Sequence, residues 1–363
     1  MTLLTAAFPA RYVQGPDALG HFGEEAARFG QRILVLADAT LPEEIVARLD
    51  PTGVEMTVET VEPAATETAI SYAVDRAKAL GADAIAGLGG GKTLDQARAA
   101  ADICRLPFIS VPSSASSDAP CSALAVIYGE DGEVIEDRFV RTNPALVLVD
   151  SSVILSAPAR LLAAGIGDAL ATWFEARACL MSGANNMTGG RQTRLAMQIA
   201  ETCYDTLIEY GVTALADLKG GFLSPALEAV IEANILMSGL GFESGGVAAA
   251  HAIHHGLAEL RETHGALHGE KVAFGVLVGL VLNDAPIEEI TKVREFLAQT
   301  GLPTYLGAVG ITDADAAIPV IAKRACRAGE IIHNEPIEIT TALVEAALRE
   351  ADLIGRPKEL SNA

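Results

Sequence analysis

The sequence predicts an α/β domain with a Rossmann-like parallel sheet over residues 1–157, followed by an all-helical domain over residues 158–363. From Arg32 to about Asp150, short apolar runs alternate with helical patterns, an order typical of a parallel sheet covered by helices. After Pro158 the strand signals end, and alanine- and leucine-rich segments with helical spacing take their place. This change predicts the boundary between the two domains.

Short apolar segments predict the strands of the first domain. They are RILVLAD from Arg32, VEMTVET from Val54, ADAIAGLG from Ala82, LPFISVPSS from Leu106, SALAVIYG from Ser122 and ALVLVD from Ala145. The helical pattern TETAISYAVDRAKAL lies between the second and third of these strands. Gly129 and the Asp131-Gly132 pair, which lie between apolar flanks, predict a β-hairpin.

Four long segments predict the main helices of the second domain. They are LLAAGIGDALATWFEARACLM, TRLAMQIAETCYDTLIEYG, SPALEAVIEANILMSGLGF and KVAFGVLVGLVL. Open parallel sheets bind ligands at the carboxyl ends of their strands, so we expect the binding cleft to face these helices.

Composition narrows the classes of function. The 26 basic and 47 acidic residues leave a net charge of 26 − 47 = −21, which disfavours nucleic acid and anionic membranes as partners. The five cysteines include no CxxC pair, so we expect neither a disulfide framework nor a cysteine zinc site. The N-terminus lacks the features of a signal peptide, and the stretch VAFGVLVGLVL is too short for a bilayer. We therefore expect a soluble, cytoplasmic protein.

The stretch GLGGGKTLDQARAA, Gly87 to Ala100, joins a predicted strand to a predicted helix. A P-loop would need its first glycine at Ala86, and the GxGxxG motif would need its last glycine at Lys92, so neither motif is present. The glycines either let the helix pack close to the strand or expose N–H groups at a helix start, where the dipole favours phosphate. Asp95 either accepts hydrogen bonds from the same ligand or is simply a first-turn acid.

A second polar loop, VPSSASSDAPCSA, follows the next predicted strand. It is either an exposed loop with helix-capping serines or a binding loop in which serines surround a cofactor. In the second case Asp118, the only acid in the loop, would face the reacting centre.

A cluster of histidines marks the second domain. Five of the seven fall within eighteen residues: His251, His254, His255, His264 and His268. Residues three and four apart share a helix face, so His251 pairs with either His254 or His255, and spacing does not decide which are metal ligands. Asp168, in GIGDALATWFEARA, is expected near the start of a helix, where by itself it would be an N-cap or first-turn acid.

Five stretches occur in order between about residue 10 and the C-terminus: GGGKTLD, SSASSDAPCSALAVIY, GIGDALATWFEARA, GFESGGVAAAHAIHHGL and HGEKVAFG. Together they resemble the zinc-dependent glycerol dehydrogenases of the iron-containing alcohol dehydrogenase family. The resemblance implies a dehydroquinate synthase-like architecture, NAD and Zn²⁺ as cofactors, and a small polyol as substrate. It also implies a homo-oligomer, which in this family is often an octamer.

The resemblance assigns roles position by position. Asp168, His251 and His268 match the zinc ligands, and the other histidines of the cluster would lie in the surrounding pocket. Iron-using relatives have a further histidine four residues after the aspartate, where this chain has Thr172. Three protein ligands and an open fourth position are typical of catalytic zinc. Asp118 matches a glycerol-binding acid.

The implied NAD contacts lie in the two loops and the strand after them. They are Gly91, Lys92, Thr93, Leu94, Asp95, Ser113, Ser114, Ala115, Ser116, Ser122, Leu124 and Tyr128. Asp38, which ends the RILVLAD segment, is placed to hold the adenosine ribose, and its charge would disfavour the extra phosphate of NADP.

The implied reaction is the reversible oxidation of glycerol at C2 to dihydroxyacetone, with zinc polarising the hydroxyl and NAD accepting the hydride. Asp118 would orient the polyol, and zinc-bound solvent or a histidine such as His255 would carry the proton. Other vicinal diols are alternative substrates. A dehydroquinate synthase-like lyase or a glycerol-1-phosphate dehydrogenase would need a basic cluster, whereas the cleft segments offer Lys92, Arg261 and Lys271 alone. A cofactor-binding protein without catalysis is a further alternative, which removal of the metal would test.

Overall fold

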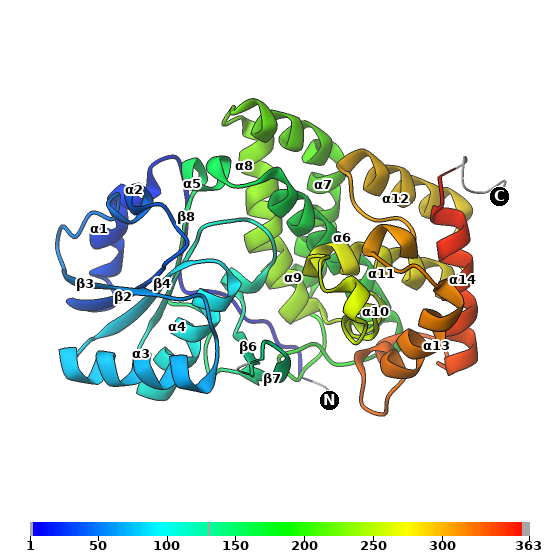
Figure 1. Cartoon of the computed structure of the whole chain (residues 1–363), viewed down its shortest axis with the longest axis horizontal. Helices are drawn as coiled ribbons and strands as arrows, with labels where there is room; N and C mark the ends of the chain where they lie inside the picture. The colour runs from blue at the N-terminus through cyan, green and yellow to red at the C-terminus, as the bar shows by residue number, and fades with distance from the viewer. Residues whose placement is uncertain (1–2, 130, 358–363) are drawn as a thin grey trace.

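The computed structural model describes residues 3–129 and 131–357. Its N-terminal part contains the predicted parallel sheet, with six strands in the order β1-β8-β5-β4-β2-β3, and helices form the rest of the molecule (Figure 1). The strands are β1 (Tyr12–Gly15), β2 (Arg32–Asp38), β3 (Glu55–Val61), β4 (Ala84–Gly89), β5 (Phe108–Pro112) and β8 (Leu146–Asp150). Strand β1, with the sequence YVQG, lacks an apolar run and was not predicted.

Both faces of the sheet are covered, which explains why the four inner strands β8, β5, β4 and β2 are nearly continuous apolar runs. The accompanying helices are η1 (Ala18–His21), α1 (Phe22–Ala26), α2 (Glu43–Val46), α3 (Glu67–Leu80) and α4 (Gly91–Cys104). On β2, Ile33 and Val35 belong to an apolar cluster with η1 and α1, whereas Leu34 and Leu36 belong to another with α3 and α4. The two pairs of helices therefore lie on opposite faces (Figure 1).

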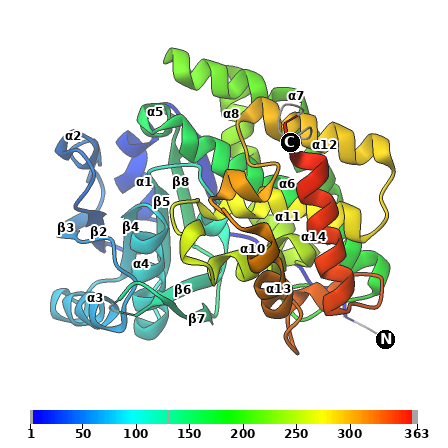
Figure 2. The same ribbon diagram turned by 45° about the vertical axis from the view of Figure 1, so that its right-hand side comes forward.

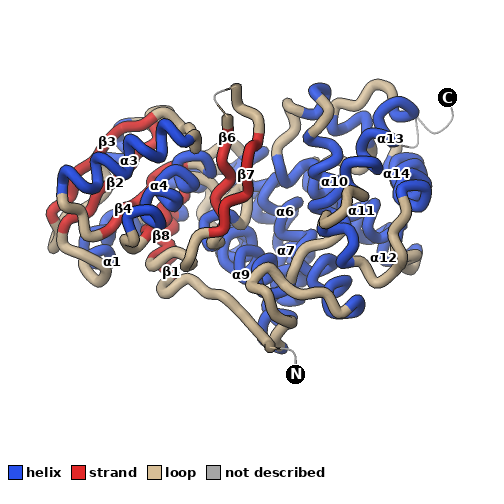
Figure 3. The backbone as a smooth tube through the Cα atoms, turned by 90° about the horizontal axis from the view of Figure 1, so that it is seen from below, coloured by secondary structure: helices blue, strands red, loops and turns tan. Residues whose placement is uncertain are grey.

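The predicted hairpin is confirmed as a separate two-stranded sheet. Strands β6 (Leu124–Tyr128) and β7 (Val134–Phe139) pair antiparallel with each other and do not join the main sheet. Figure 3 shows them between the main sheet and the helical part. Residue 130, within the predicted turn, lies outside the described residues.

Beyond Asp150 the named elements are helical. They are α5 (Ser151–Ser156), α6 (Ala159–Ser182), α7 (Arg194–Gly220), α8 (Pro225–Glu232), α9 (Ser238–Gly245), α10 (Ala249–Ala258), α11 (His268–Leu282), α12 (Ile287–Thr300), α13 (Ala314–Ala325) and α14 (Thr341–Gly355). Short segments complete the set: η2 (Ala119–Cys121), the π-helical η3 (Ala233–Met237) between α8 and α9, η4 (Arg261–Thr263), η5 (Leu306–Val309) and η6 (Ile331–Asn334). The four predicted helical segments are confirmed, and the domain boundary at residue 157 stays a prediction.

Helices α6, α10 and α11 pack against one another within the apolar core of the helical part (Figure 2). In the described ranges, no single helix has both the length and the apolar character needed to cross a membrane. One bent pair, Arg194–Gly220 with Pro225–Gly245, passes that test by length and composition only.

The expected position of Asp168 near a helix start is wrong. Helix α6 begins at Ala159, so Asp168 lies in the middle of a 24-residue helix. The two glycines before it are not a helix boundary but points of close contact. A Cβ on Gly165 would lie 2.0 Å from the carbonyl oxygen of Ala115, and one on Gly167 would lie 2.4 Å from that of Gly269.

Helix α11 offers a test of this close packing. A Cβ on Gly275 would lie 2.4 Å from the carbonyl oxygen of Ala250, whereas one on Gly279, a turn later, would lie 3.4 Å from the Cβ of Ala249. We expect Gly275→Ala to lower the free energy of unfolding by about 1–3 kcal/mol, because α10 and α11 must separate. The control Gly279→Ala should change it by less than about 1 kcal/mol or raise it slightly, since alanine favours helix. Urea unfolding measures both, and equal values would contradict the close contact.

Candidate metal and substrate site

Three helices bring together one carboxylate and two imidazoles. Asp168 lies in the middle of α6, His251 in the first turn of α10, and His268 is the first residue of α11. One ligand atom from each lies within 4.8 Å of the other two. The Nε2 atoms of His268 and His251 lie 3.0 and 3.5 Å from Oδ1 of Asp168. The structure thus brings together the three residues that the sequence resemblance selected.

The surroundings of these atoms fit a metal-ligand set. Oδ1 of Asp168 is buried and accepts no hydrogen bond from any described residue, although two ring nitrogens lie close to it. The Nδ1 atom of His251 lies 2.6 Å from Oε2 of Glu175. A carboxylate only accepts, so Nδ1 of His251 carries a proton, which leaves Nε2 as the ring nitrogen that a metal would bind. Metal-binding histidines are typically held by such a carboxylate.

Glu175 is a site residue that the sequence analysis missed. It lies seven residues after Asp168 on α6, which is two helical turns, so both carboxylates are on the same face. Its Oε1 accepts hydrogen bonds from the backbone N–H groups of Ala248 and His251, at 2.9 and 3.0 Å. Glu175 therefore holds both the start of α10 and the ring of His251. The seven-residue spacing between Asp168 and Glu175 is the sequence feature that indicates this shared face.

The other three histidines have different positions. Nε2 of His254 lies 3.2 Å from Nδ1 of His268, so one of these two nitrogens donates a hydrogen bond to the other. His255 contacts Glu330, with 3.1 Å between Nδ1 and Oε2. His264 is exposed, and its ring contacts the backbone of Ala258. His254 thus contacts the proposed ligand His268, His255 contacts Glu330, and His264 is turned toward solvent, so the role of all three as pocket residues stays a prediction.

Burial and charge shift the pKa values of this cluster. Burial raises the pKa of Asp168, but His268 and His251 outweigh it and hold that pKa well below its usual range. Burial lowers the pKa of His251, but Glu175 and Asp168 raise it well above the usual value. For His254, burial and then the neighbouring His268 both lower the pKa. The site therefore stabilises positive charge beside Asp168 and a neutral ring at His254.

Asp118 lies directly beside the cluster. Its backbone N–H donates to Oδ2 of Asp168 at 3.2 Å, and its own Oδ2 accepts a hydrogen bond from the hydroxyl of Ser238 at 3.3 Å. Burial, followed by the charge of Asp168, raises the pKa of Asp118 well above its usual value. The one acid of the polar loop thus lies beside Asp168 and is held there through its backbone.

The candidate cofactor residues follow three neighbouring strands of the sheet. Asp38 ends β2, the turn Gly91–Asp95 opens α4 just after β4, and the loop 113–122 follows β5. These strands are adjacent in the order β5-β4-β2, and parallel strands end at the same edge. Asp38 accepts hydrogen bonds from the backbone N–H of Thr40 at 2.9 Å and from the Thr93 hydroxyl at 3.3 Å.

Lys92 of the first loop contacts the hairpin, whereas the serines of the second loop contact their own loop. The Nζ of Lys92 lies 4.8 Å from the centroid of the Tyr128 ring. The hydroxyls of Ser114 and Ser116 lie 3.2 Å apart, and the hydroxyl of Ser122 donates to the backbone of the same loop. Thr93 and Leu94 are buried within the first turn of α4.

Arg98 is a second residue that the sequence analysis missed. Its guanidinium is almost fully buried, and it donates to the carboxylate of Asp95 and to the carbonyl oxygens of Ala119 and Leu124. Burial raises the pKa of Asp95 to about 6 despite this partner. Asp95 is therefore more than a first-turn acid, because it anchors the arginine that holds the polar loop against α4.

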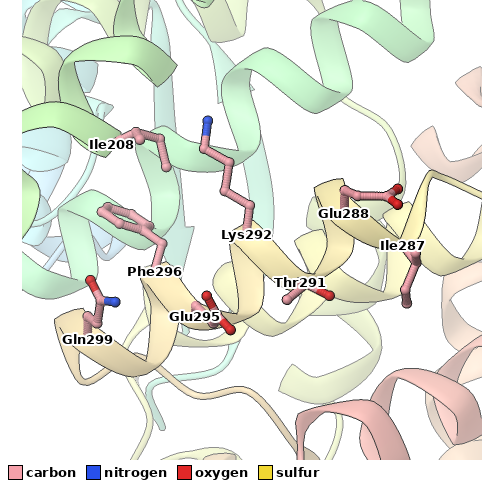
Figure 4. A pocket seen from close by; sticks show the side chains of 8 residues that line it. All are labelled: Ile208, Ile287, Glu288, Thr291, Lys292, Glu295, Phe296 and Gln299. Atoms are coloured by element: carbon pink, nitrogen blue, oxygen red, sulfur yellow. The ribbon is translucent and has the colours of Figure 1, made fainter.

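A separate surface hollow of about 500 Å³ lies between α7 and α12 (Figure 4). Its lining residues are Ile208, Ile287, Glu288, Thr291, Lys292, Glu295, Phe296 and Gln299. Nζ of Lys292 lies 5.1 Å from the ring centroid of Tyr204. The hollow shares no residue with the candidate site and contains no cluster of metal-ligating side chains.

A second buried carboxylate, Glu335, holds the start of α10 from the other side. Oε1 accepts from the backbone N–H of Ala249 at 2.9 Å, and Oε2 accepts from the amide of Asn283 at 2.8 Å. Burial raises the pKa of Glu335 to about 7, although both hydrogen bonds lower it. Because the folded-state pKa lies above the unfolded value, the stabilising effect is complete below about 4.5 and is lost as pH rises through about 7.

We therefore expect the stability of the protein to respond to pH through Glu335. Between pH 5 and pH 9, the wild type should lose up to about 3 kcal/mol of unfolding free energy relative to Glu335→Gln. Urea unfolding at several pH values measures this difference. Glu338→Gln, a change at an exposed glutamate nearby, is the control and should follow the wild type. A constant difference between Glu335→Gln and the wild type would contradict the raised pKa.

Known proteins resemble this chain along nearly its whole length. Residues 9–151 match the model of the family described as iron-containing alcohol dehydrogenase. The chain is 44% identical to the glycerol dehydrogenase of Thermotoga maritima, over 98% of this chain and 99% of that protein. It is also 44% identical to the glycolaldehyde reductase of Halobacterium salinarum, over 96% of this chain and 97% of that protein.

The fold comparison agrees. The crystal structure of a probable glycerol dehydrogenase from Sinorhizobium meliloti 1021 matches with a TM-score of 0.92 and 40% identity, covering 97% of this chain and 99% of that one. The resemblance drawn from the five sequence stretches is therefore confirmed. The chain belongs to the iron-containing alcohol dehydrogenase family, and it is an oxidoreductase.

Proposed function

We propose that this chain oxidises glycerol reversibly at C2 to dihydroxyacetone, with NAD as hydride acceptor and a zinc ion bound by Asp168, His251 and His268. The observation that carries the proposal is the convergence of these three side chains directly beside Asp118, next to the strand ends where a dinucleotide would bind. The names of the relatives in Thermotoga maritima and Sinorhizobium meliloti support the choice of substrate.

The chain's own groups divide the work. When bound, zinc acts as a Lewis acid on the substrate hydroxyl, and NAD accepts the hydride. Two imidazoles and one carboxylate form the donor set common in catalytic zinc sites, and the Glu175 carboxylate keeps His251 in the required tautomer. Asp118 orients the polyol through a hydrogen bond to a second hydroxyl group. His255, which is half-buried against Glu330, is a candidate to carry the released proton.

The cofactor assignments rest on position. Gly91 to Asp95 would meet the pyrophosphate and nicotinamide at the start of α4, where N–H groups favour an anion. Ser113 to Ser116, with Ser122, Leu124 and Tyr128, would complete the NAD site. Asp38 would hold the ribose hydroxyls, and its carboxylate would oppose the phosphate of NADP. We also propose a cytoplasmic homo-oligomer, on the strength of the family resemblance.

One relative supports a second candidate activity at the same site. The glycolaldehyde reductase of Halobacterium salinarum is as similar to this chain as the Thermotoga maritima enzyme is. Glycolaldehyde and dihydroxyacetone both carry a hydroxyl on the carbon adjacent to the carbonyl group, so the same metal site and Asp118 would suit both. Reduction of glycolaldehyde with NADH is therefore the alternative to be measured.

The activity is tested by following NADH with a panel of substrates. We expect glycerol and 1,2-propanediol to be oxidised, with loss of activity on chelation and recovery when zinc is restored. NADP should replace NAD poorly. Glycolaldehyde with NADH runs beside the panel and distinguishes the two candidate substrates. Polyol oxidation that survives complete removal of the metal would contradict the proposal.

A matched pair of histidine variants tests the ligand set. His268→Ala should lower kcat/KM by more than the roughly 10- to 100-fold expected when an outer partner of a metal ligand is lost. It should also abolish tight zinc binding in calorimetry while the fold, measured by circular dichroism, is retained. His264→Ala, which removes an exposed ring four residues away, is the control and should bind zinc normally. Equal zinc affinity in both variants would remove His268 from the ligand set.

A further inference from the structure

Two buried hydroxyl groups form a hydrogen-bonded chain that ends on Asp118. Oγ1 of Thr172 lies 3.0 Å from Oγ of Ser238, which lies 3.3 Å from Oδ2 of Asp118. Thr172 and Ser238 are both buried, with exposed fractions of 3% and 0%. Thr172 lies one turn after Asp168 on α6, so the two hydrogen-bonded hydroxyls lie beside the candidate metal ligands and are not themselves ligands.

The direction of donation follows from counting protons. Ser238 has a single hydroxyl proton and donates it to Oδ2 of Asp118. The contact between Thr172 and Ser238 then needs a proton from Thr172. The order of donation is therefore Thr172 to Ser238 to Asp118, and Thr172 orientates the hydroxyl of Ser238.

The backbone that carries Ser238 is also fixed to the polar loop. Ser238 directly follows the π-helical segment η3, and wide turns of this kind are frequent at functional sites. Within η3, the buried amide of Asn234 donates to the carbonyl oxygens of Ala115 and Leu162, at 2.9 and 3.2 Å. Segment η3 thus holds the loop backbone through Asn234, and the first residue of α9, Ser238, holds the acidic side chain of the loop.

We propose that Ser238, orientated by Thr172, is a positioning residue that determines the specificity for polyols. It holds Oδ2 of Asp118, whereas Oδ1 makes no hydrogen bond with any of the described residues and is left to accept one from a second substrate hydroxyl. Asp118 would therefore select a substrate with two neighbouring oxygen groups, which is a 1,2-diol or its hydroxycarbonyl product. This inference rests on the proposed function, because it concerns how Asp118 meets the substrate.

The test compares single variants of the zinc- and NAD-loaded enzyme. Ser238→Ala should raise KM for glycerol and lower kcat/KM by up to about tenfold, because the hydrogen bond that holds Oδ2 of Asp118 is lost. KM for NAD, and zinc affinity measured by calorimetry, should stay within about twofold. Ser244→Ala is the matched control, since it removes a buried hydroxyl from the same helix whose partner is the backbone of Ala7. Its kinetics should equal those of the wild type.

Two further comparisons separate positioning from general damage. Thr172→Val, which loses the hydroxyl, should show a smaller rise in KM in the same direction, whereas Thr172→Ser, which keeps the hydroxyl, should restore wild-type kinetics. In an Asp118→Asn background, Ser238→Ala should cause little additional loss, because Ser238 acts through the carboxylate. The pair of Thr172 variants decides the matter even if Ser238→Ala folds poorly.

Failure of the positioning role and failure of the proposed function would give different results. If the wild type oxidises glycerol and Asp118→Asn impairs it, but Ser238→Ala behaves like Ser244→Ala, the positioning role is overturned and the proposed function stands. The same holds if Ser238→Ala lowers kcat/KM equally in both backgrounds. A zinc-loaded wild type without activity on any diol or hydroxycarbonyl would overturn the proposed function itself, and the role of Ser238 with it.

Discussion

The candidate site depends on one backbone contact between two helices. A Cβ on Gly269, in the first turn of α11, would lie 1.8 Å from the carbonyl oxygen of Ala164 on α6. The two helices can therefore approach closely only because no side chain stands at this position. His268 immediately precedes Gly269, and this approach brings its ring to 3.0 Å from Asp168. Any widening of the contact would separate the two proposed ligands.

Buried negative charge is the second feature of the site. Asp168, Glu175 and Glu335 are nearly inaccessible, and Asp118 lies beside Asp168. Backbone N–H groups at the start of α10 offset the charges of Glu175 and Glu335. Asp168 has no such partner for Oδ1, and it raises the pKa of Asp118. A divalent cation bound by Asp168, His251 and His268 would offset this negative charge in place of protonated imidazoles, which agrees with the proposed zinc site.

The polar loop after β5 connects the two halves of the molecule. From the side of the sheet, the buried guanidinium of Arg98 holds the carbonyl oxygens of Ala119 and Leu124. From the side of the helices, Asn234 and Ser238 hold the same loop at Ala115 and at Asp118. A cofactor at the strand ends and a substrate at the metal would therefore share one loop, whose position is fixed from both directions.

The sequence by itself determined the kinds of element, the glycine and serine loops, and the family, because apolar periodicity and short motifs are local properties. It did not determine the position of Asp168 within its helix, since the two glycines before it are equally compatible with a helix boundary and with a close contact between helices. Only the tertiary structure decided that His251 and His268 reach Asp168, and that Glu175, Arg98 and Ser238 support the site. These contacts join segments up to 120 residues apart, and such distances are set by how helices pack and not by any local pattern.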